Sequence, residues 1–358
     1  MTTARLQPEA AKVMRDAIRE AGGVEVFAIG DVRDGEVSAV TVTCRGLHDQ
    51  VLAILGRPKA GQVVLHNHPS GVLLPSPADM NLASRYSENG VGFIIVDNDV
   101  QRSNWVVEPH DDRDVPLSED EVLAFFHESL PQALPGFELR QEQVDMALAV
   151  TRSLSDKEPL AVEAGTGTGK SLAYLIPAAL WALKNKKKVV LSTYTKALQT
   201  QLLHKDLPLL GKAGLEVRTA LLMGRNNYLC KRRLRLAAAE AEDADKTAFS
   251  DLMAWDASTS TGARLDLTMD LPYELWEKVE SDSDLTLRAR CPHHDVCHYY
   301  QARRRAAAAQ LVVVNHALLL ADRANRESGG PGVLPAYERL ILDEAHHLEA
   351  AATGAMSD

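Results

Sequence analysis

The sequence lacks the features of membrane and secreted proteins. No apolar run reaches the roughly 20 residues that a membrane-spanning helix needs, and residues 1–20 contain no apolar core of a signal peptide. The chain has only four cysteines among 358 residues. In a reducing compartment, such cysteines are more often metal ligands or core residues than disulfides. We therefore expect a cytoplasmic protein without membrane contact.

A general excess of positive charge is also missing. The formal net charge is −10, which argues against a protein that coats nucleic acid with its whole surface. A local basic groove remains compatible with this charge, because binding depends on the patch and not on the total. The composition, 46% hydrophobic and 25% charged, is that of a globular protein. The length exceeds one ordinary core and predicts two domains.

The expected boundary lies at residues 113–134. Residues 108–121 are acidic and contain proline, and residues 130–136 add two more prolines. We expect a linker with a short helix here, between an α/β domain at 1–112 and a second domain at 135–358. In the second domain, strand-like apolar runs, the first at 159–163, alternate with helical stretches. This alternation predicts a parallel sheet with crossover helices.

A histidine pair in the first domain predicts a metal site. His66 and His68, at the end of a predicted strand, can face one ion, and Asp79 can return on the next helix as a third ligand. Three protein ligands leave a position for water, as in catalytic zinc sites. Glu25, on an early predicted strand, is the candidate general base. A bare His-x-His is often a surface coincidence, but the longer pattern that includes Ser76 and Asp79 is much rarer.

This pattern resembles the JAB/JAMM (MPN+) metalloprotease family, and most of all its RadC-type bacterial branch, over about residues 10–110. The resemblance implies that the two histidines and Asp79 hold Zn²⁺, that Glu25 is the acid/base, and that Ser76 supports the oxyanion. Glu20 lies nearby and is the other candidate for the upstream glutamate. The family hydrolyses peptide or isopeptide bonds. The alternative is a domain that recruits a protein partner and keeps zinc for its structure.

The string AGTGTGKS at 164–171 is a phosphate-binding loop. It follows a predicted strand and precedes an apolar helical stretch, which is the context that this motif requires. Its glycines let backbone N–H groups cradle phosphate at the N-terminus of a helix. Lys170 would reach the β- and γ-phosphates, and Ser171 would bind Mg²⁺. The expected ATP-binding residues of the loop are Ala164, Gly165, Thr166, Gly167, Thr168, Gly169, Lys170 and Ser171.

The string DEAH at 343–346 supplies the acids that such a loop needs. Asp343 would hold Mg²⁺ through water, and Glu344 would orient or deprotonate the attacking water. Glu344 and Lys170 are therefore the expected catalytic pair of an ATP-driven motor of the helicase type. Gln143 lies just before the first helix of this domain, where superfamily 2 helicases carry an adenine-reading glutamine.

Further strings at 192–202, 224–230, 291–297 and 312–319 complete a recognisable set. From about residue 135 to its end, the chain resembles the DinG-type helicases, relatives of the xeroderma pigmentosum group D helicase. The resemblance implies ATP-driven 5′-to-3′ movement on single-stranded DNA, in repair or in processing of DNA structures. In this family a second motor lobe with an arginine finger follows the DEAH box. Because this chain ends at Asp358, we expect ATP binding with little hydrolysis and no unwinding by this polypeptide alone.

The resemblance also implies an insertion, at about 225–305, in which four cysteines hold a 4Fe–4S cluster. This insertion has only Cys230, Cys291 and Cys297, while Cys44 lies in the first domain. A cubane cluster normally takes four thiolates. A nearby histidine as fourth ligand, a structural zinc and free thiols therefore all remain open.

Two groups of residues are candidates for DNA contact. The hydroxyl groups in the string at 192–202 could bond DNA phosphates, although an ordinary helix cap would look the same. An arginine run with tyrosines nearby suits single-stranded DNA, since cations follow the backbone while aromatic rings stack on bases. Most such runs, however, are solvated surface. The candidates are Ser192, Thr193, Thr195, Arg303, Arg304 and Arg305.

Three functions follow from these motifs. The first is a DinG-type DNA helicase, of which this chain is the N-terminal part. The second is a zinc-dependent hydrolase of modified proteins that the motor lobe targets to DNA. The third, a non-enzymatic adaptor, conflicts with the presence of all the catalytic residues in both motifs.

Overall fold

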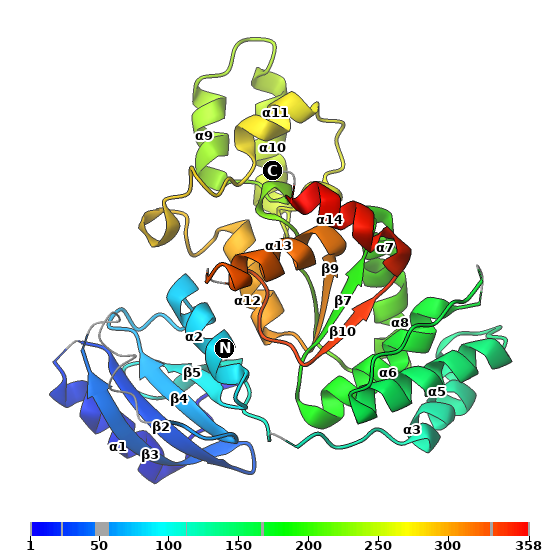
Figure 1. Ribbon diagram of the computed structural model, residues 1–358. Coiled ribbons are helices and arrows are strands. Elements are labelled where there is room, and N and C mark those ends of the chain that lie inside the picture. Colours follow the sequence, from blue (N-terminus) through cyan, green and yellow to red (C-terminus); the bar gives the residue numbers. More distant parts are fainter. Residues whose placement is uncertain are drawn as a thin grey trace.

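Two α/β domains lie side by side in the computed structural model, and a helical insertion projects from the second (Figure 1). The structure describes residues 2–22, 24–46, 57–111, 113–165, 168–329 and 332–356. The predicted α/β class is confirmed for both domains. No helix in the described ranges is long and apolar enough to cross a lipid bilayer.

The N-terminal domain is built on a six-stranded sheet of order β1-β6-β5-β4-β2-β3. β4 and β5 pair in parallel, and the other neighbours are antiparallel. Asp34 and Gly35, both with positive φ, form the tight turn between β2 and β3, as such hairpins require. The strands are β1 (Thr2–Thr3), β2 (Val26–Arg33), β3 (Glu36–Arg45), β4 (Gln62–Asn67), β5 (Gly92–Val96) and β6 (Arg102–Val107).

Two helices cover opposite faces of this sheet. α1 (Pro8–Glu20) packs Met14 and other apolar residues against the face that carries Val26. α2 (Pro77–Ser87) packs on the face that carries Phe27. Successive side chains of a strand point to opposite faces, so β2 contributes to both cores. This arrangement places the start of α2 beside the end of β4.

The second domain, here called the motor lobe, contains a parallel sheet of order β10-β7-β9-β8. The residues of β7 and most of those of β9 are buried, as in sheets covered by helices on both faces. The predicted parallel sheet with crossover helices is therefore confirmed. The strands are β7 (Val189–Thr193), β8 (Thr219–Leu221), β9 (Leu311–Asn315) and β10 (Arg339–Leu342).

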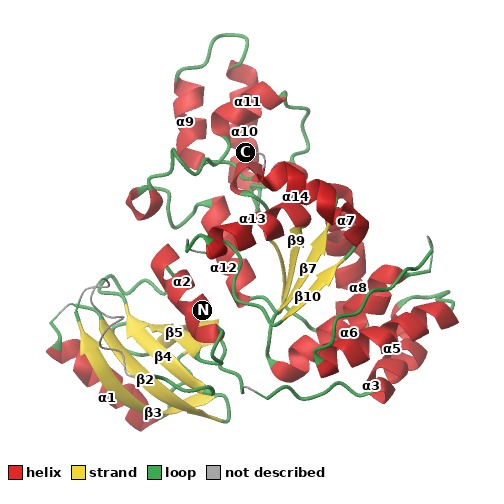
Figure 2. Ribbon diagram, in the orientation of Figure 1, coloured by secondary structure: helices red, strands yellow, loops and turns green. Residues whose placement is uncertain are grey.

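Helices surround this sheet (Figure 2). They are α5 (Gln141–Asp156), α6 (Lys170–Asn185), α7 (Lys196–Gln201), α8 (Leu207–Lys212), α12 (His298–Ala308), α13 (His316–Glu327) and α14 (Leu348–Met356). Shorter turns of other helix types are Leu202–Asp206 (π) and Arg225–Asn227, Arg264–Asp266, Arg288–Arg290 and Ala345–His347 (3₁₀).

The strand predicted at 159–163 does not form. Leu160 and Val162 are each 44% exposed, and the segment is not paired with any described strand. β10 is the edge strand of the described sheet, and its Leu340 is 41% exposed. The apolar run at 159–163 thus predicted a strand, but this segment is not buried against the described sheet.

The stretch at 113–134, expected to be a linker, belongs to the core of the motor lobe. α3 (Glu119–Ala124), a π-helical turn (Phe125–Ser129) and α4 (Leu130–Ala133) follow one another directly. Phe126 and Leu130 are fully buried in the same cluster as the inner faces of α5 and α6. The acidic and proline-rich composition concealed this set of apolar residues.

The insertion is helical and has a core of its own. α9 (Lys231–Ala239), α10 (Lys246–Ser258) and α11 (Tyr273–Val279) pack around Trp276 and Phe249, which are 0% and 1% exposed. Figures 1 and 2 show these helices standing away from the sheet of the motor lobe.

The two domains share side chains at their contact. α12 of the motor lobe lies against α2 and β6. Ala307 of α12 packs against the core of the N-terminal domain, and Met80 of α2 packs in the core of the motor lobe. Arg304 Nε donates to the carbonyl of Pro75 over 3.0 Å. No motif or composition in the chain predicted this contact between the domains.

Candidate metal centre and nucleotide site

The three predicted zinc ligands meet at one point in the N-terminal domain. His66 Nε2 lies 3.2 Å from Asp79 Oδ1, His68 Nε2 lies 3.1 Å from Asp79 Oδ2, and the two Nε2 atoms are 3.1 Å apart. A tetrahedral zinc with bonds of about 2.0–2.1 Å holds its ligand atoms about 3.3 Å apart. Among the described residues, this is the one group of three His, Cys, Asp or Glu ligand atoms so close together. The arrangement therefore fits a single zinc ion.

Local structure fixes the orientation of each ligand. His66, in β4, stacks on Phe27 with ring centroids 4.8 Å apart. The Nδ1 of His68 is 2.6 Å from the carbonyl of Val72; donation to that oxygen leaves Nε2 free to bind a metal. Asp79 is held by the N-cap of α2, because the Ser76 N–H donates to Asp79 Oδ2 over 2.7 Å.

The electrostatics favour the metal-binding forms of His66 and Asp79. Burial lowers the pKa of His66 and so favours the neutral imidazole. Burial alone would raise the pKa of Asp79, but hydrogen bonds from His66 and His68 hold it well below its ordinary value. Burial opposes protonation of His68 as well, but the bond to Asp79 outweighs it and raises the pKa of His68. Zinc would compete with that proton.

Glu25 lies immediately before β2, and its charge raises the pKa of both histidines. The alternative, Glu20, is paired with Arg45 at 2.7 Å, and its side chain is 65% exposed. The geometry therefore favours Glu25 as the acid/base. A bound zinc would polarise a carbonyl group and lower the pKa of a water molecule. The role of Glu25 in accepting that proton stays a prediction.

The role of Ser76 in stabilising an oxyanion stays a prediction. Its hydroxyl oxygen accepts from the N–H of Asp79 over 3.2 Å, and the two residues form a capping box. That bond does not use the hydroxyl hydrogen, which can still be donated to a substrate oxygen.

In the motor lobe, the phosphate-binding loop meets the DEAH string. Lys170 Nζ, at the start of α6, is 3.3 Å from Glu344 Oε1. Asp343 follows β10, and its Oδ2 accepts from the hydroxyl of Tyr174 over 3.2 Å. Residues 174 positions apart in the chain thus lie together. The structure thus brings together residues of the types that bind phosphate and orient water in P-loop enzymes.

The rest of the loop is described in part. Thr168 donates to the carbonyl of Gly165 over 3.0 Å, and Ala164 is half-buried. The predicted positions Thr166 and Gly167 lie outside the described residues. Ser171 is half-buried, and its side chain interacts with Asp206, whose pKa is raised by burial.

Gln143 lies beside this loop. It is 4% exposed, and its amide donates to the carbonyl of Gly169 over 2.8 Å. A cavity of about 630 Å³ adjoins it, lined among others by Phe137, Arg140 and Leu172. The cavity offers an aromatic ring and a cation next to the loop, as a site for adenine requires.

The sequence analysis missed Tyr174. Its pKa is raised well above the ordinary value by burial, and the charge of Asp343 raises it further. Burial likewise raises the pKa of Asp343, and the neighbouring charge of Glu344 adds to the effect. Tyr174 is four residues after Lys170 in α6, so helical periodicity places both on the same face. That spacing could have identified it.

Two of the three predicted DNA-contacting hydroxyl groups are not accessible. Ser192 and Thr193 are fully buried, and Ser192 Oγ lies 2.7 Å from His316 Nδ1. These residues are in β7, inside the sheet, so the prediction of phosphate contact by them is corrected. Thr195 caps α7 by accepting from the N–H of Leu198, the ordinary role weighed above. Its contact with DNA stays a prediction.

The predicted arginine run lies on α12, and each guanidinium has a carbonyl partner. Arg303 donates to Gly332, Arg304 to Pro75 of the N-terminal domain and Arg305 to Ser260. Arg305 is exposed, whereas the other two are half-buried at the domain contact. A role of these arginines in DNA binding stays a prediction, since Arg304 has a structural role of its own.

The cysteines of the insertion do not complete a ligand set. A tetrahedral zinc with Zn–S bonds of about 2.3 Å holds its sulfur atoms about 3.8 Å apart. Among the described residues, no three ligand atoms of these cysteines and the nearby histidines lie within 4.8 Å of one another. A 4Fe–4S cluster normally takes four thiolates, one more than the insertion supplies. His293 contacts Arg235 and His298 contacts Asp256. The cluster, its fourth ligand and the alternative structural zinc stay predictions.

Known protein families match the two parts of the chain that contain these sites. Residues 22–96 match the RadC-like JAB domain family. Residues 144–241 match the DEAD/DEAH box helicase family, and residues 216–358 match the DEAD_2 family. The family boundaries thus fall within the two domains of the structure.

Most of the similar proteins of known name are helicases, and one is named an exonuclease. The chain is 42% identical to the ATP-dependent DNA helicase YoaA of Escherichia coli over 61% of this chain and 35% of that protein. It is 37% identical to the ATP-dependent helicase DinG of Mycobacterium tuberculosis, over 65% and 37%. It is 35% identical to the 3′-5′ exonuclease DinG of Bacillus subtilis, over 67% and 26%. The aligned part is thus about a third of the length of these relatives. On this sequence and site evidence, the chain belongs to the DinG-type DEAD/DEAH-box helicase family and carries a RadC-like JAB domain at its N-terminal side.

Proposed function

We propose that the motor lobe is the ATP-binding lobe of a DNA helicase that moves 5′ to 3′ on single-stranded DNA in repair. The contact of Lys170 with Glu344 carries this proposal, because it joins the phosphate-binding and water-activating groups. The helicase names of the relatives support it. Translocation would also need a second motor lobe, and a cytoplasmic location follows from such a role.

Each residue of the site has a step in this proposal. Lys170 would leave Glu344 to bind the β- and γ-phosphates, freeing the carboxylate to orient the attacking water. Ser171 and Asp343 would bind Mg²⁺, and Gln143 would read adenine beside the loop. The described lobe would therefore bind ATP together with Mg²⁺.

The test is equilibrium binding of a fluorescent ATP analogue with Mg²⁺. Lys170→Ala should weaken binding by at least about 10-fold, because it removes a charge-assisted contact worth about 1.5–3 kcal/mol. Lys184→Ala is the matched control, since Lys184 lies on the same helix and is paired with Glu121. Equal affinities of the wild type and Lys170→Ala would refute the assignment.

We also propose a second function, a zinc-dependent hydrolase of peptide or isopeptide bonds in the N-terminal domain. The ligand distances of 3.1–3.2 Å among His66, His68 and Asp79 carry it. The substrate would be a protein that the motor lobe brings near DNA. A domain that only recruits a protein partner would use the same zinc for structure.

Two measurements separate these possibilities. Zinc content should fall from about one per chain to near zero in His68→Ala, while His127→Ala, on an exposed residue of the motor lobe, keeps it. Glu25→Gln should keep zinc and lose hydrolysis of an isopeptide-linked fluorogenic peptide. Full zinc in His68→Ala excludes the site, and a zinc-loaded wild type without hydrolysis of any peptide favours recruitment.

A further inference from the structure

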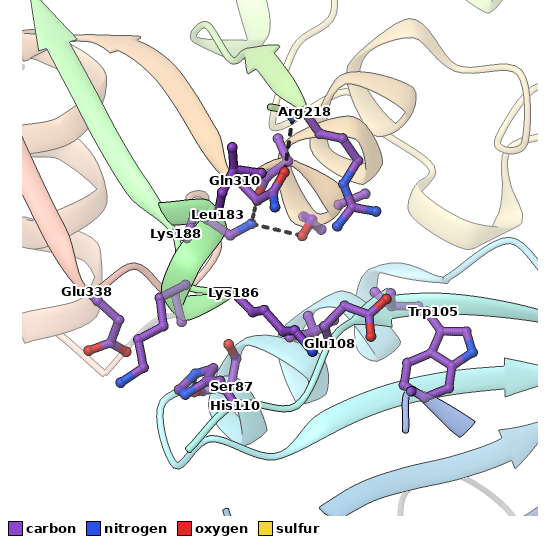
Figure 3. A pocket seen from close by; sticks show the side chains of 18 of the residues that line it. Ser87, Trp105, Glu108, His110, Leu183, Lys186, Lys188, Arg218, Gln310 and Glu338 are labelled. Atoms are coloured by element: carbon purple, nitrogen blue, oxygen red, sulfur yellow. Dashed lines mark hydrogen bonds between the residues drawn. The ribbon is translucent and has the colours of Figure 1, made fainter. Parts of the chain in front are cut away.

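A cavity of about 290 Å³ lies between the two domains, away from both sites described above (Figure 3). The N-terminal domain contributes Trp105, Glu108 and His110 from β6 and the segment after it. The motor lobe contributes Lys186 and Lys188, from the segment between α6 and β7, and Arg218, which precedes β8. Figure 3 shows the side chains of both domains converging on this space.

Some of the charges around the cavity cancel in pairs. Arg5 is 2.6 Å from Glu108 and also covers the ring of Trp105 at 3.8 Å. Lys187 is turned away and is 2.6 Å from Asp114. These pairs contribute no net charge to the cavity.

The remaining charges are mainly positive. Within the part of the chain that the structure describes, neither Lys186 nor Arg218 has an acidic partner in salt-bridge range. Glu338 is the one lining acid left to oppose them. The Lys188 ammonium donates to carbonyls at the end of α12, including those of Ala306 and Ala307 at 3.2 and 3.0 Å. Lys186 and Arg218 therefore face one acid, and Lys188 adds positive charge when it is protonated.

Burial disfavours the charged form of Lys188. The pKa of Lys188 is lowered to about 7, first by burial and then by the charge of Arg218. Cations that destabilise one another in a recess form a site where an anion is favoured, since it relieves their repulsion. The side chains of Lys186 and Arg218 supply hydrogen-bond donors for such an anion.

We propose that this cavity binds a small phosphate-bearing anion that bridges the two domains. The volume is at the lower limit for small-molecule sites, which suits inorganic phosphate, pyrophosphate or the phosphate of a mononucleotide. Lys186 and Arg218 would bind its oxygens from the motor lobe, and Trp105 with the Arg5–Glu108 pair would border it on the side of the N-terminal domain. The site depends on neither zinc nor the phosphate-binding loop.

The test is calorimetric titration of the full chain with pyrophosphate. Lys170→Ala is the background, because it disables the phosphate-binding loop. In that background, Lys186→Ala and Arg218→Ala should each weaken binding about 10-fold, as expected for loss of one charge-assisted contact. Arg323→Ala is the matched control, since this arginine of α13 is exposed and does not line the cavity.

Parallel titrations with phosphate and AMP identify the source of the anion. Tighter binding of AMP than of phosphate would assign the site to nucleotides, and the reverse order to free phosphates. All variants should keep the circular dichroism and melting temperature of their background, since Lys186 and Arg218 are exposed. Absence of binding, or binding that both variants leave unchanged, overturns the proposal.

Discussion

Replacing Asp114 by asparagine should destabilise the motor lobe far more than an ordinary substitution. The carboxylate of Asp114 is 2.6 Å from Lys187 Nζ and 2.5 Å from an Arg339 nitrogen. The side chains of these three residues are 5%, 4% and 11% exposed. The variant therefore leaves two buried cations without a counter-charge.

The expected loss follows from this burial. Removal of one partner from a buried ion pair costs about 3–5 kcal/mol. Because the asparagine oxygen can still accept one hydrogen bond, we expect a loss of about 3 kcal/mol, near the lower end of that range. A salt bridge of similar length on the surface, between Asp243 and Lys246, offers the comparison: Asp243 is 97% exposed. Asp243→Asn should cost less than about 0.5 kcal/mol.

The dependence on pH has a definite sign. The pKa of Asp114 is lowered: burial alone would raise it, but the bonds to Lys187 and Arg339 outweigh burial. Its stabilisation is therefore present above the unfolded-state pKa of about 3.9 and is lost as pH falls through the lower folded-state pKa. The wild type should lose stability below about pH 4 more steeply than Asp114→Asn.

Hydrogen exchange in increasing urea, read from peptides of α5, α6 and β10, measures the stability of this lobe alone. The double variant Asp114→Asn/Lys187→Met should recover part of the loss, because it removes one of the stranded cations. If Asp114→Asn lost no more stability than Asp243→Asn, the idea of a buried charge centre at Asp114 would be wrong.

Three further predictions concern the two sites. Gly169→Ala should weaken ATP-analogue binding at least about 10-fold, because the glycine has φ of +80° and an added Cβ would lie 2.1 Å from the Gln143 amide nitrogen; unchanged binding would contradict the geometry. Arg304→Ala should lower zinc affinity, measured by chelator competition, because it releases the carbonyl of Pro75 next to the helix cap that holds Asp79; Arg303→Ala is its control, and equal affinities in the two would contradict the coupling. Zinc affinity should fall as pH falls below 7, because protons compete for His68, whose pKa is raised; a flat profile from pH 7 to pH 5 would contradict that competition.

The local motifs were predictable from the sequence because their spacing fixes their geometry. His66 and His68 lie on and just after one strand, and Asp79 opens the next helix, so the short connection forces the three together. The phosphate-binding loop and the DEAH acids were also predictable from their motifs, although the strand expected before the loop does not form.

The predictions were wrong where the composition was misleading, or where packing between distant parts of the chain determines the structure. The buried faces of α3 and α4 were hidden by acidic residues and prolines, and a linker was expected in their place. Ser192 and Thr193 read as exposed hydroxyl groups, but both lie in a buried strand whose neighbours the sequence did not reveal. Contacts between residues far apart in the chain, such as Arg304 with Pro75, leave no local signal at all.

Ala307 and Met80 each pack into the core of the other domain. This packing limits how the protein can be divided into fragments or fused to other proteins. Family boundaries suggest a RadC-like module that could be cut off or grafted elsewhere, but a cut at residue 112 would bare the apolar surface around Met80. The motor lobe would likewise present α12, with Ala307, to water. Fragments designed for crystallography or fusion should therefore carry polar replacements at these two positions, or retain both partners.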